Sequence, residues 1–365
     1  MRRLITALAI SFGLAQAAHS LDSSQGPLTV TPVVTGLEQP WGAGFLPDGS
    51  ILISERGGRL LRAGPGQGVQ PVEGVPPVYA QGQGGLLDVL VPSDFAETRQ
   101  VFLSFSKNQR RGAGTALGRG TLSPDFSRFD SFEVIFETEP GFSGGRHFGS
   151  RIVEAPDGTL FLTVGDRGDR PSAQDRANHN GAVLRLTRDG AAPADNPFVG
   201  QSGIQPEIWS YGHRNPQGAA LDLDGQLWTA EHGAQGGDEV NRVVKGANFG
   251  WPVISYGRHY SGGRIGEGTE KPGLEQPAFY WDPSMAPSGM MIYSGRLWPE
   301  WRGDAFVGSL KFSYISRLDM DGNVREVEQL ESPETARVRH VLEGPAGAIW
   351  FLSVNDGTLY QVTPG

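Results

Sequence analysis

A histidine and an aspartate in two glycine-rich segments have the residue types and spacing of a proton-transfer pair. His147 lies in the segment Gly-Gly-Arg-His-Phe-Gly-Ser at 144–150, and Asp166 follows the apolar stretch 160–164. If these segments flank adjacent antiparallel strands, the carboxylate comes close to the imidazole, orients it and raises its basicity, as a general base requires. The residue pattern alone also allows a metal-ligating histidine or a hydrogen-bonded histidine in the core.

Four cationic side chains come from separate parts of an acidic chain. Arg214 lies in the segment Tyr-Gly-His-Arg-Asn-Pro-Gln-Gly at 211–218, Lys311 ends an apolar stretch, and Arg337 and Arg339 stand two residues apart. If this last segment is a strand, both arginines project to one side and form a fork that suits carboxylates. Together the four cations would neutralise a polyanionic ligand. The alternative is a charged strand edge that discourages aggregation.

The segment 230–241, Ala-Glu-His-Gly-Ala-Gln-Gly-Gly-Asp-Glu-Val-Asn, is dense in oxygen ligands and backbone carbonyls. Ligands of this kind favour calcium over zinc, although a solvated acidic loop has the same composition. A zinc site of familiar spacing is not expected, because the chain has no cysteine and no His-Glu-x-x-His motif. Gln83, flanked by Gly82 and Gly84, adds an amide side chain where a ligand can approach the backbone closely.

The first twenty residues have the parts of a secretory signal peptide: two arginines, an apolar run that ends near Leu14 and small residues at 15–17, with cleavage expected near 17–20. The apolar run is too short to span a bilayer, so no membrane span is expected. The lack of cysteine fits a bacterial periplasmic or secreted enzyme that is held together by its core alone. The net charge of -9 argues against binding to nucleic acid.

The elements that must position these residues are predicted to be short strands separated by turns. No long stretch has apolar residues at helical spacing, whereas short apolar runs recur between turn residues. A similar turn precedes such a run at 46–49, 92–95, 155–158, 223–225 and 344–347, with a weaker copy at 298–300. We therefore predict an all-β, six-bladed β-propeller with four-stranded antiparallel blades around a central channel, in one domain over residues 21–365. The alternative is a two-sheet sandwich, which rarely exceeds about 250 residues.

Six segments, in this order, resemble the soluble pyrroloquinoline quinone-dependent sugar dehydrogenases, and most closely the aldose sugar dehydrogenase branch. They are Gln-Gly-Gly-Leu-Leu at 83–87, His147 with Gly-Asp at 165–166, Ser-Tyr-Gly-His-Arg-Asn-Pro-Gln-Gly at 210–218, Glu-His-Gly-Ala-Gln-Gly-Gly-Asp-Glu-Val-Asn at 231–241, Lys-Gly-Ala-Asn-Phe-Gly-Trp-Pro at 245–252 and Gly-Ser-Leu-Lys at 308–311. The likeness covers nearly the whole chain after the signal peptide. It implies a six-bladed propeller that holds the quinone and calcium over its channel, in agreement with the blade count above.

The resemblance also implies roles for individual residues. His147 corresponds to the general base, Asp166 to its acidic partner and Arg214 to a group that stabilises charge on the quinone. The cofactor-binding positions that it implies are Gln83, Arg214, Asn215, Tyr260, Lys311, Arg337 and Arg339.

The metal ligands that the resemblance implies are mostly backbone groups. The carbonyls of Gly233 and Ala234 correspond to ligands of the cofactor's calcium ion, and Glu239 with the carbonyl of Phe249 corresponds to a second calcium site. Ala234 and Phe249 stand where proline and tyrosine are common in the family. Ligation by a backbone carbonyl tolerates both changes.

The activity implied is oxidation of an aldose sugar at carbon 1 to the lactone. Neutral His147 takes the proton of the anomeric hydroxyl while a hydride passes to the quinone, whose carbonyl Ca²⁺ polarises. Besides the sugar, the expected partner is an artificial or respiratory electron acceptor, and a monomer is favoured over a homodimer.

Two other functions share the predicted architecture. Calcium-dependent propeller lactonases and esterases need carboxylates and amides around their metal and no cluster of cations, so Lys311, Arg337 and Arg339 argue against them. A non-catalytic glycan-binding propeller would have no use for a buried histidine and carboxylate pair.

Overall fold

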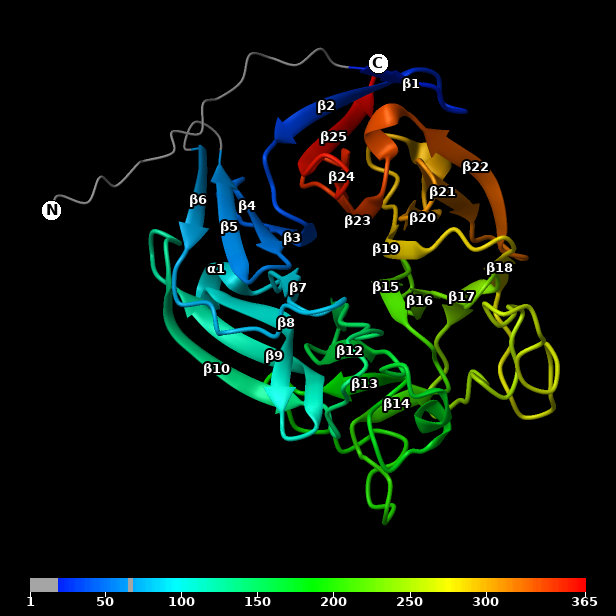
Figure 1. Ribbon diagram of the computed structural model, residues 1–365. Coiled ribbons are helices and arrows are strands. Elements are labelled where there is room, and N and C mark those ends of the chain that lie inside the picture. Colours follow the sequence, from blue (N-terminus) through cyan, green and yellow to red (C-terminus); the bar gives the residue numbers. More distant parts are fainter. Residues whose placement is uncertain (1–18, 65–67) are drawn as a thin grey trace, which may run out of the picture.

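The computed structural model describes residues 19–64 and 68–365, which form six antiparallel sheets arranged as blades around a common axis (Figure 1). The first blade contains β3 (Pro40–Phe45), β4 (Ile51–Glu55), β5 (Arg59–Gly64) and β6 (Gly68–Val72), and the second contains β7 (Leu86–Leu90), β8 (Gln100–Gln109), β9 (Gly112–Leu122) and β10 (Phe129–Glu137). The third contains β11 (Ile152–Glu154), β12 (Leu160–Val164), β13 (Ala182–Leu186) and β14 (Ile208–Tyr211), and the fourth contains β15 (Pro216–Leu221), β16 (Leu227–Glu231), β17 (Asp238–Arg242) and β18 (Phe279–Trp281). The fifth contains β19 (Pro287–Ile292), β20 (Ala305–Ser309), β21 (Tyr314–Asp319) and β22 (Arg325–Glu331), and the sixth contains β23 (Val338–Glu343), β24 (Ile349–Ser353), β25 (Thr358–Pro364), β2 (Leu28–Val34) and β1 (His19–Leu21).

The first strands of the blades form a closed inner ring. β3 contacts β7, and the contacts continue through β11, β15, β19 and β23 back to β3. This arrangement confirms the predicted six-bladed, all-β propeller, and the two-sheet sandwich is wrong.

The sixth blade joins the two ends of the described chain and differs from the prediction in its strand number. β2 pairs antiparallel with β25, with Leu28 opposite Pro364, and β1 extends the sheet to five strands. This pairing closes the ring by backbone hydrogen bonds between segments more than 300 residues apart in the sequence. Residues 1–18, which make up most of the predicted signal peptide, lie outside the described part of the chain.

The turn that recurs in the sequence precedes the second strand of each blade, which explains why its composition is repeated. At 46–49 the amide of Gly49 donates to the carbonyl of Leu46, and at 155–158 that of Gly158 donates to Ala155. Gly49 and Gly158 have φ of 82° and 79°, a left-handed conformation that glycine adopts without steric cost. The copies at 92–95 and 298–300 instead enter the short helices α1 (Phe95–Thr98) and η2 (Pro299–Trp301).

Apolar side chains pack between neighbouring blades and fix their relative positions. Phe306 of β20 and Phe351 of β24 belong to one buried cluster, and Phe102 of β8 and Leu162 of β12 belong to another. Helices are confined to α1, η2, η1 (Arg170–Gln174) and η3 (Pro333–Thr335) in the described chain, and none of its helices has the length and apolar composition needed to cross a membrane.

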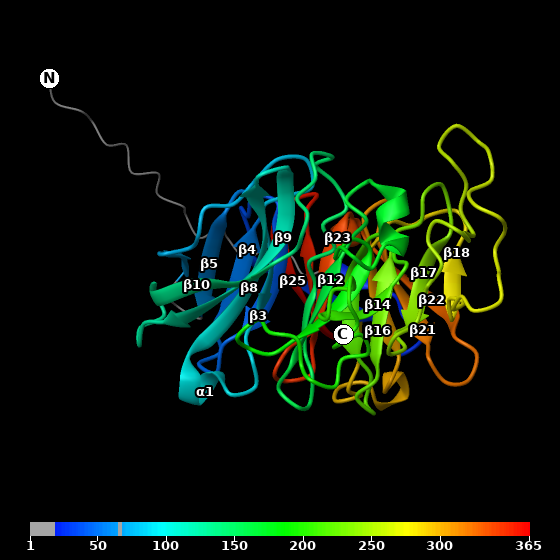
Figure 2. The same cartoon turned by 90° about the horizontal axis from the view of Figure 1, so that it is seen from below.

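One face of the propeller collects the beginnings of the first strands and the ends of the second strands. Pro40 at the start of β3 lies opposite Glu55 at the end of β4, and Pro216 lies opposite Glu231 in the same way. The connection between β17 and β18 is long and projects beyond the blades near this face (Figure 2). Loops from all six blades therefore meet at one end of the channel, where propellers usually bind ligands.

Candidate active site

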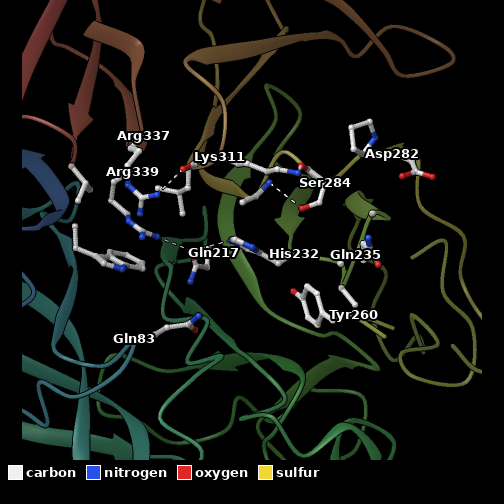
Figure 3. Close-up of a pocket in the computed structure, with 18 of the residues that line it drawn as sticks. Gln83, Gln217, His232, Gln235, Tyr260, Asp282, Ser284, Lys311, Arg337 and Arg339 are labelled. Carbon is white, nitrogen blue, oxygen red and sulfur yellow. Dashed lines mark hydrogen bonds between the residues drawn. The ribbon is translucent and has the colours of Figure 1, made fainter. Parts of the chain in front are cut away.

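A cavity of about 1120 Å³ opens on this face (Figure 3). Seven of the residues that the sequence predicts for the site line it: Gln83, Gly233, Ala234, Tyr260, Lys311, Arg337 and Arg339. The other predicted residues, His147, Asp166, Arg214, Asn215, Glu239 and Phe249, lie outside this lining. Hydrogen bonds join His147 and Arg214 to it, since the His147 amide donates to Gln83 Oε1 at 2.8 Å and Arg214 Nη1 donates to the His232 carbonyl at 3.0 Å.

The predicted proximity of His147 and Asp166 is confirmed. His147 precedes β11 and Asp166 follows β12, so the antiparallel pairing of these strands brings the two residues to the same end of the third blade. His147 Nδ1 lies 2.6 Å from Asp166 Oδ1, and the carboxylate is fully buried. His147 has φ of 56°, an uncommon conformation for a residue other than glycine that is often found at functional sites.

Their surroundings keep the histidine neutral and the aspartate ionised. Burial lowers the pKa of His147 and outweighs the hydrogen bond that His147 donates to Asp166, while the positive charges of Arg214 and Arg146 lower it further. Burial alone would raise the pKa of Asp166, but hydrogen bonds from His147 and the Gly168 amide and the charge of Arg214 leave it below its usual value. The pair therefore consists of an imidazole and a carboxylate, with Nδ1 of His147 as the donor.

Arg214 and Asn215 stand at the start of the fourth blade. The Arg214 amide donates to Glu231 Oε2 at 2.6 Å, and its buried Nε has no hydrogen-bond partner within the described residues. Asn215 Oδ1 accepts a hydrogen bond from the Gly149 amide at 3.1 Å, so this amide side chain supports the loop that carries His147.

The three cations of the last two blades reach one side of the cavity, as predicted. Lys311 Nζ donates to the Ser284 carbonyl at 3.1 Å, Arg337 Nη1 to the Leu310 carbonyl at 3.0 Å and Arg339 Nη1 to Gln217 Oε1 at 2.7 Å. Burial, together with the charges of Arg151 and Arg337, lowers the pKa of Arg339 to about 9. In the part of the chain that the structure describes, no carboxylate pairs with these three groups, so their charge is available to an anionic ligand.

The strand geometry proposed for Arg337 and Arg339 is wrong, although both reach the cavity. Arg337 has φ of 52° and precedes β23, and the pairing of β23 with β24 shifts register between Val338 and His340. The irregular backbone at this bulge replaces the side-to-side alternation of a regular strand. It therefore sets the directions in which the two guanidinium groups point.

Two of the residues predicted as calcium ligands, Glu239 and Phe249, contact a buried polar network in the fourth blade. Asn241 Nδ2 donates to Glu231 Oε1 at 2.9 Å and to Glu239 Oε2 at 3.3 Å, and His213, which Glu231 binds at 2.8 Å, stacks on the Phe249 ring at 4.5 Å. Burial and the negative charges of Glu231 and Asp238 raise the pKa of Glu239 to about 8. A bound cation would relieve this repulsion.

The described residues contain no group of three acidic or histidine side chains arranged to hold a metal ion. The ligands predicted for calcium here are instead mostly backbone carbonyls, those of Gly233, Ala234 and Phe249, together with the Glu239 carboxylate. Hard oxygen donors next to a carboxylate with a raised pKa fit calcium.

Comparison with known proteins decides between the predicted functions. The chain matches the glucose / sorbosone dehydrogenase family over residues 37–361. It belongs to this family. It is 44% identical over 336 residues to the aldose sugar dehydrogenase YliI of Escherichia coli, a match that covers 90% of this chain and 91% of that protein. The prediction of an enzyme of the sugar dehydrogenase type is therefore confirmed.

Solved structures of sugar dehydrogenases agree with the assignment of this chain to the family. The apo form of the soluble aldose sugar dehydrogenase of E. coli superposes with a TM-score of 0.90 at 42% identity, covering 93% of this chain and 100% of that one. The PQQ-bound form of an aldose sugar dehydrogenase from Streptomyces coelicolor superposes with a TM-score of 0.76 at 27% identity, covering 92% and 98%.

Several residues that line the cavity of the dehydrogenase were missed from the sequence. They are Trp41, Arg56, Gln217, His232, Arg258, Asp282 and Ser284. Gln217 and His232 stand inside segments that carry the family likeness, next to the start of β15 and the end of β16. Trp41 and Arg56 occupy the equivalent ends of β3 and β4, so a search at these positions in every blade would have found them.

A serine hydrolase arrangement is present in the dehydrogenase but is closed to substrate. Ser210 Oγ lies 2.9 Å from His213 Nε2, and His213 Nδ1 lies 2.8 Å from Glu231 Oε1. Ser210 and His213 are fully buried, and Glu231 is only 3% exposed. These side chains therefore form a structural network beneath Arg214, and an ester cannot reach the hydroxyl.

Proposed function

We propose that this protein oxidises aldose sugars at carbon 1 to the corresponding lactones, with pyrroloquinoline quinone and Ca²⁺ as cofactors. The observation that carries the proposal is the 2.6 Å contact between His147 and buried Asp166. It lies beside a cavity whose cations Lys311, Arg337 and Arg339 pair with no carboxylate among the described residues. A proton acceptor and a site for a polyanion are the two features that this chemistry requires.

The cationic side of the cavity would hold the quinone. Pyrroloquinoline quinone carries three carboxylates, and Lys311, Arg337 and Arg339 supply matching positive charge. Gln83 and Tyr260 line other parts of the cavity, and 74% of Tyr260 is exposed, which leaves its ring free to cover a ligand. Arg214 would complete the set, because its buried Nε has no hydrogen-bond partner among the described residues.

The carbonyls of Gly233 and Ala234 would hold the calcium ion of the cofactor. Glu239 and the Phe249 carbonyl would hold a second calcium ion next to the Asn241 network. When bound, the quinone supplies a hydride acceptor for carbon 1 of the sugar, and calcium supplies a Lewis acid that polarises its carbonyl.

His147 would move the proton. Because its Nδ1 donates to Asp166, Nε2 carries the free lone pair and accepts the proton of the anomeric hydroxyl. Asp166 stays ionised and stabilises the imidazolium that results. Arg214, close to both residues, would stabilise negative charge that develops at the cofactor.

We further propose that the protein works in the periplasm or outside the cell and passes electrons to a respiratory acceptor. The signal-like sequence of residues 1–20 supports export. A soluble dye can replace the natural acceptor in an assay.

Reconstitution of the purified protein tests this function. Addition of pyrroloquinoline quinone with Ca²⁺ should produce dye reduction that depends on an aldose, whereas quinone without Ca²⁺ should produce little. Lactone formation should match dye reduction in amount. Lack of quinone binding, or hydrolysis of lactones without quinone, would contradict the proposal.

A further inference from the structure

We infer that Trp251 is a positioning residue that fixes the orientation of the His147 and Asp166 pair, an inference that rests on the proposed function for its effect on turnover. Trp251 belongs to the connection between β17 and β18 of the fourth blade, whereas Asp166 follows β12 of the third. Its indole Nε1 donates to Asp166 Oδ2 at 2.8 Å. One side chain thus links the fourth blade to the proton-transfer pair.

The indole completes the set of donors around the buried carboxylate. Asp166 Oδ1 receives His147 Nδ1 at 2.6 Å and the Gly168 amide at 2.7 Å. Oδ2 receives the indole of Trp251. A carboxylate held at both oxygens cannot rotate about its Cβ–Cγ bond, and the imidazole that it binds is therefore held in one orientation.

Trp251 is itself fixed from several directions. Its amide donates to the Gly212 carbonyl at 2.8 Å, its carbonyl accepts from Gln174 Nε2 at 2.7 Å, and it is only 6% exposed. The indole can therefore transmit the position of the fourth blade to Asp166 rather than follow the movements of the carboxylate.

The ring of Trp251 also contacts two other parts of the proposed site. The guanidinium carbon of Arg214 lies 5.4 Å from the ring centroid, and that of Arg170 lies 5.2 Å away. The ring packs in one apolar cluster with Ala234, whose carbonyl is a proposed calcium ligand. The N–H group and the ring therefore have separable roles, the first toward Asp166 and the second toward Arg214 and Ala234.

The variant Trp251→Phe removes the N–H group and keeps an aromatic ring. The chain offers a matched control in Trp228, which is also buried and whose Nε1 donates to Asp222 Oδ2 at the same distance of 2.8 Å, on the opposite face. Trp228→Phe removes an indole–carboxylate bond of the same length away from the site, although this bond is only partly buried. Any general cost of losing such a bond appears in both variants.

The first test uses the apoprotein and is independent of catalysis. In protein labelled with ¹⁵N-histidine, the Nδ1–H resonance of His147, assigned by its loss in His147→Gln, should shift in Trp251→Phe and stay unchanged in Trp228→Phe. An unchanged His147 resonance in Trp251→Phe would overturn the positioning role. This outcome can be read even if the protein has no sugar dehydrogenase activity.

The second test uses protein reconstituted with quinone and Ca²⁺. Trp251→Phe should lower the rate constant for reduction of the bound quinone by sugar about tenfold, because one hydrogen bond to a charged group is lost, while quinone affinity stays within about twofold. In an Asp166→Asn background the same substitution should change the rate less than about twofold, since the residue acts through Asp166. Equal losses in both backgrounds, or an equal loss in Trp228→Phe, would overturn the inference. Absence of sugar-dependent reduction in the unmodified protein would instead contradict the proposed function.

Discussion

The backbone amide of His147 donates a hydrogen bond to the side-chain oxygen of Gln83 at 2.8 Å, across the boundary between the second and third blades. The backbone amide of Gln83 in turn donates a hydrogen bond to the Gly145 carbonyl at 2.8 Å. The loop that carries the proposed base is therefore held by a residue that also lines the cavity. In the proposed function, cofactor binding by Gln83 and placement of the His147 base would therefore share this contact.

Replacement of the base should separate binding from chemistry. In His147→Gln, quinone affinity should remain within about threefold of the unmodified protein, because the binding cations are untouched. Turnover should fall about 10²- to 10⁴-fold, the usual contribution of a positioned general base. Titration of quinone and steady-state dye reduction measure the two quantities. Loss of quinone binding with turnover retained would contradict the assignment.

The pH dependence of turnover should reflect a histidine with a lowered pKa. Only neutral His147 accepts a proton, so turnover should rise as pH increases through its pKa and level off above it. Burial and the charges of Arg214 and Arg146 place this pKa below its ordinary value of 6.5, so the rise should occur below pH 6.5.

Arg146→Gln provides the control for this profile. Removal of its positive charge should raise the pKa of His147 and move the rise in turnover to higher pH. The groups that remain near the imidazole, Asp166, Arg214 and His232, are unchanged. A profile that moves to lower pH in this variant would contradict the electrostatic account.

The cations of the cavity should determine quinone affinity. Arg339→Ala and Lys311→Ala should each weaken quinone binding about tenfold or more, the cost of one charged hydrogen bond. Arg302→Ala is the matched control, because Arg302 Nη1 donates to the Ser294 carbonyl at the opposite face. Fluorescence titration of the apoprotein measures the dissociation constants. Equal effects of all three substitutions would show that the cavity is not the quinone site.

A buried ion pair below the cavity should contribute strongly to stability. Asp88 Oδ1 lies 2.6 Å from Arg151 Nη1, both side chains are almost fully buried, and the guanidinium lies 4.4 Å from the Trp41 ring. Asp88→Leu should lower the free energy of unfolding by about 3–5 kcal/mol, because it leaves a buried charge without a partner.

The double variant Asp88→Leu/Arg151→Met should recover much of that loss, since it removes both charges. Urea denaturation followed by fluorescence measures the difference. Additive losses in the double variant would contradict the pairing.

Local sequence features predicted most of the fold, and the exceptions depend on distant contacts. Gly49 and Gly158 mark the recurring turn because its left-handed conformation selects glycine. The fifth strand of the last blade was not predicted, because β1 joins the sheet through contacts with β2, and β2 pairs with the far end of the chain. The composition of β1 and of β2 does not indicate which strand each one pairs with.

The sequence predicted contacts in the candidate site where both the residue types and the pairing of neighbouring strands indicated them. The contact of His147 with Asp166 follows from two adjacent antiparallel strands. Trp41 and Arg56 were missed although Gly42 follows the first and Gly57 follows the second. Only the pairing of β3 with β4 brings these two strand ends together at the cavity. Trp251 was also missed as a neighbour of Asp166, since its contact joins two blades across 85 positions of sequence.

Reduction of the bound quinone by an aldose deuterated at carbon 1 is the most direct test of the central claim. The protein, loaded with quinone and Ca²⁺ and mixed anaerobically with sugar, should show a change in quinone absorbance without any external acceptor. Deuterium at carbon 1 should slow this change several-fold, and His147→Gln should nearly abolish it. A quinone spectrum that does not respond to sugar, or a rate that is the same for both isotopes and for His147→Gln, would contradict the account.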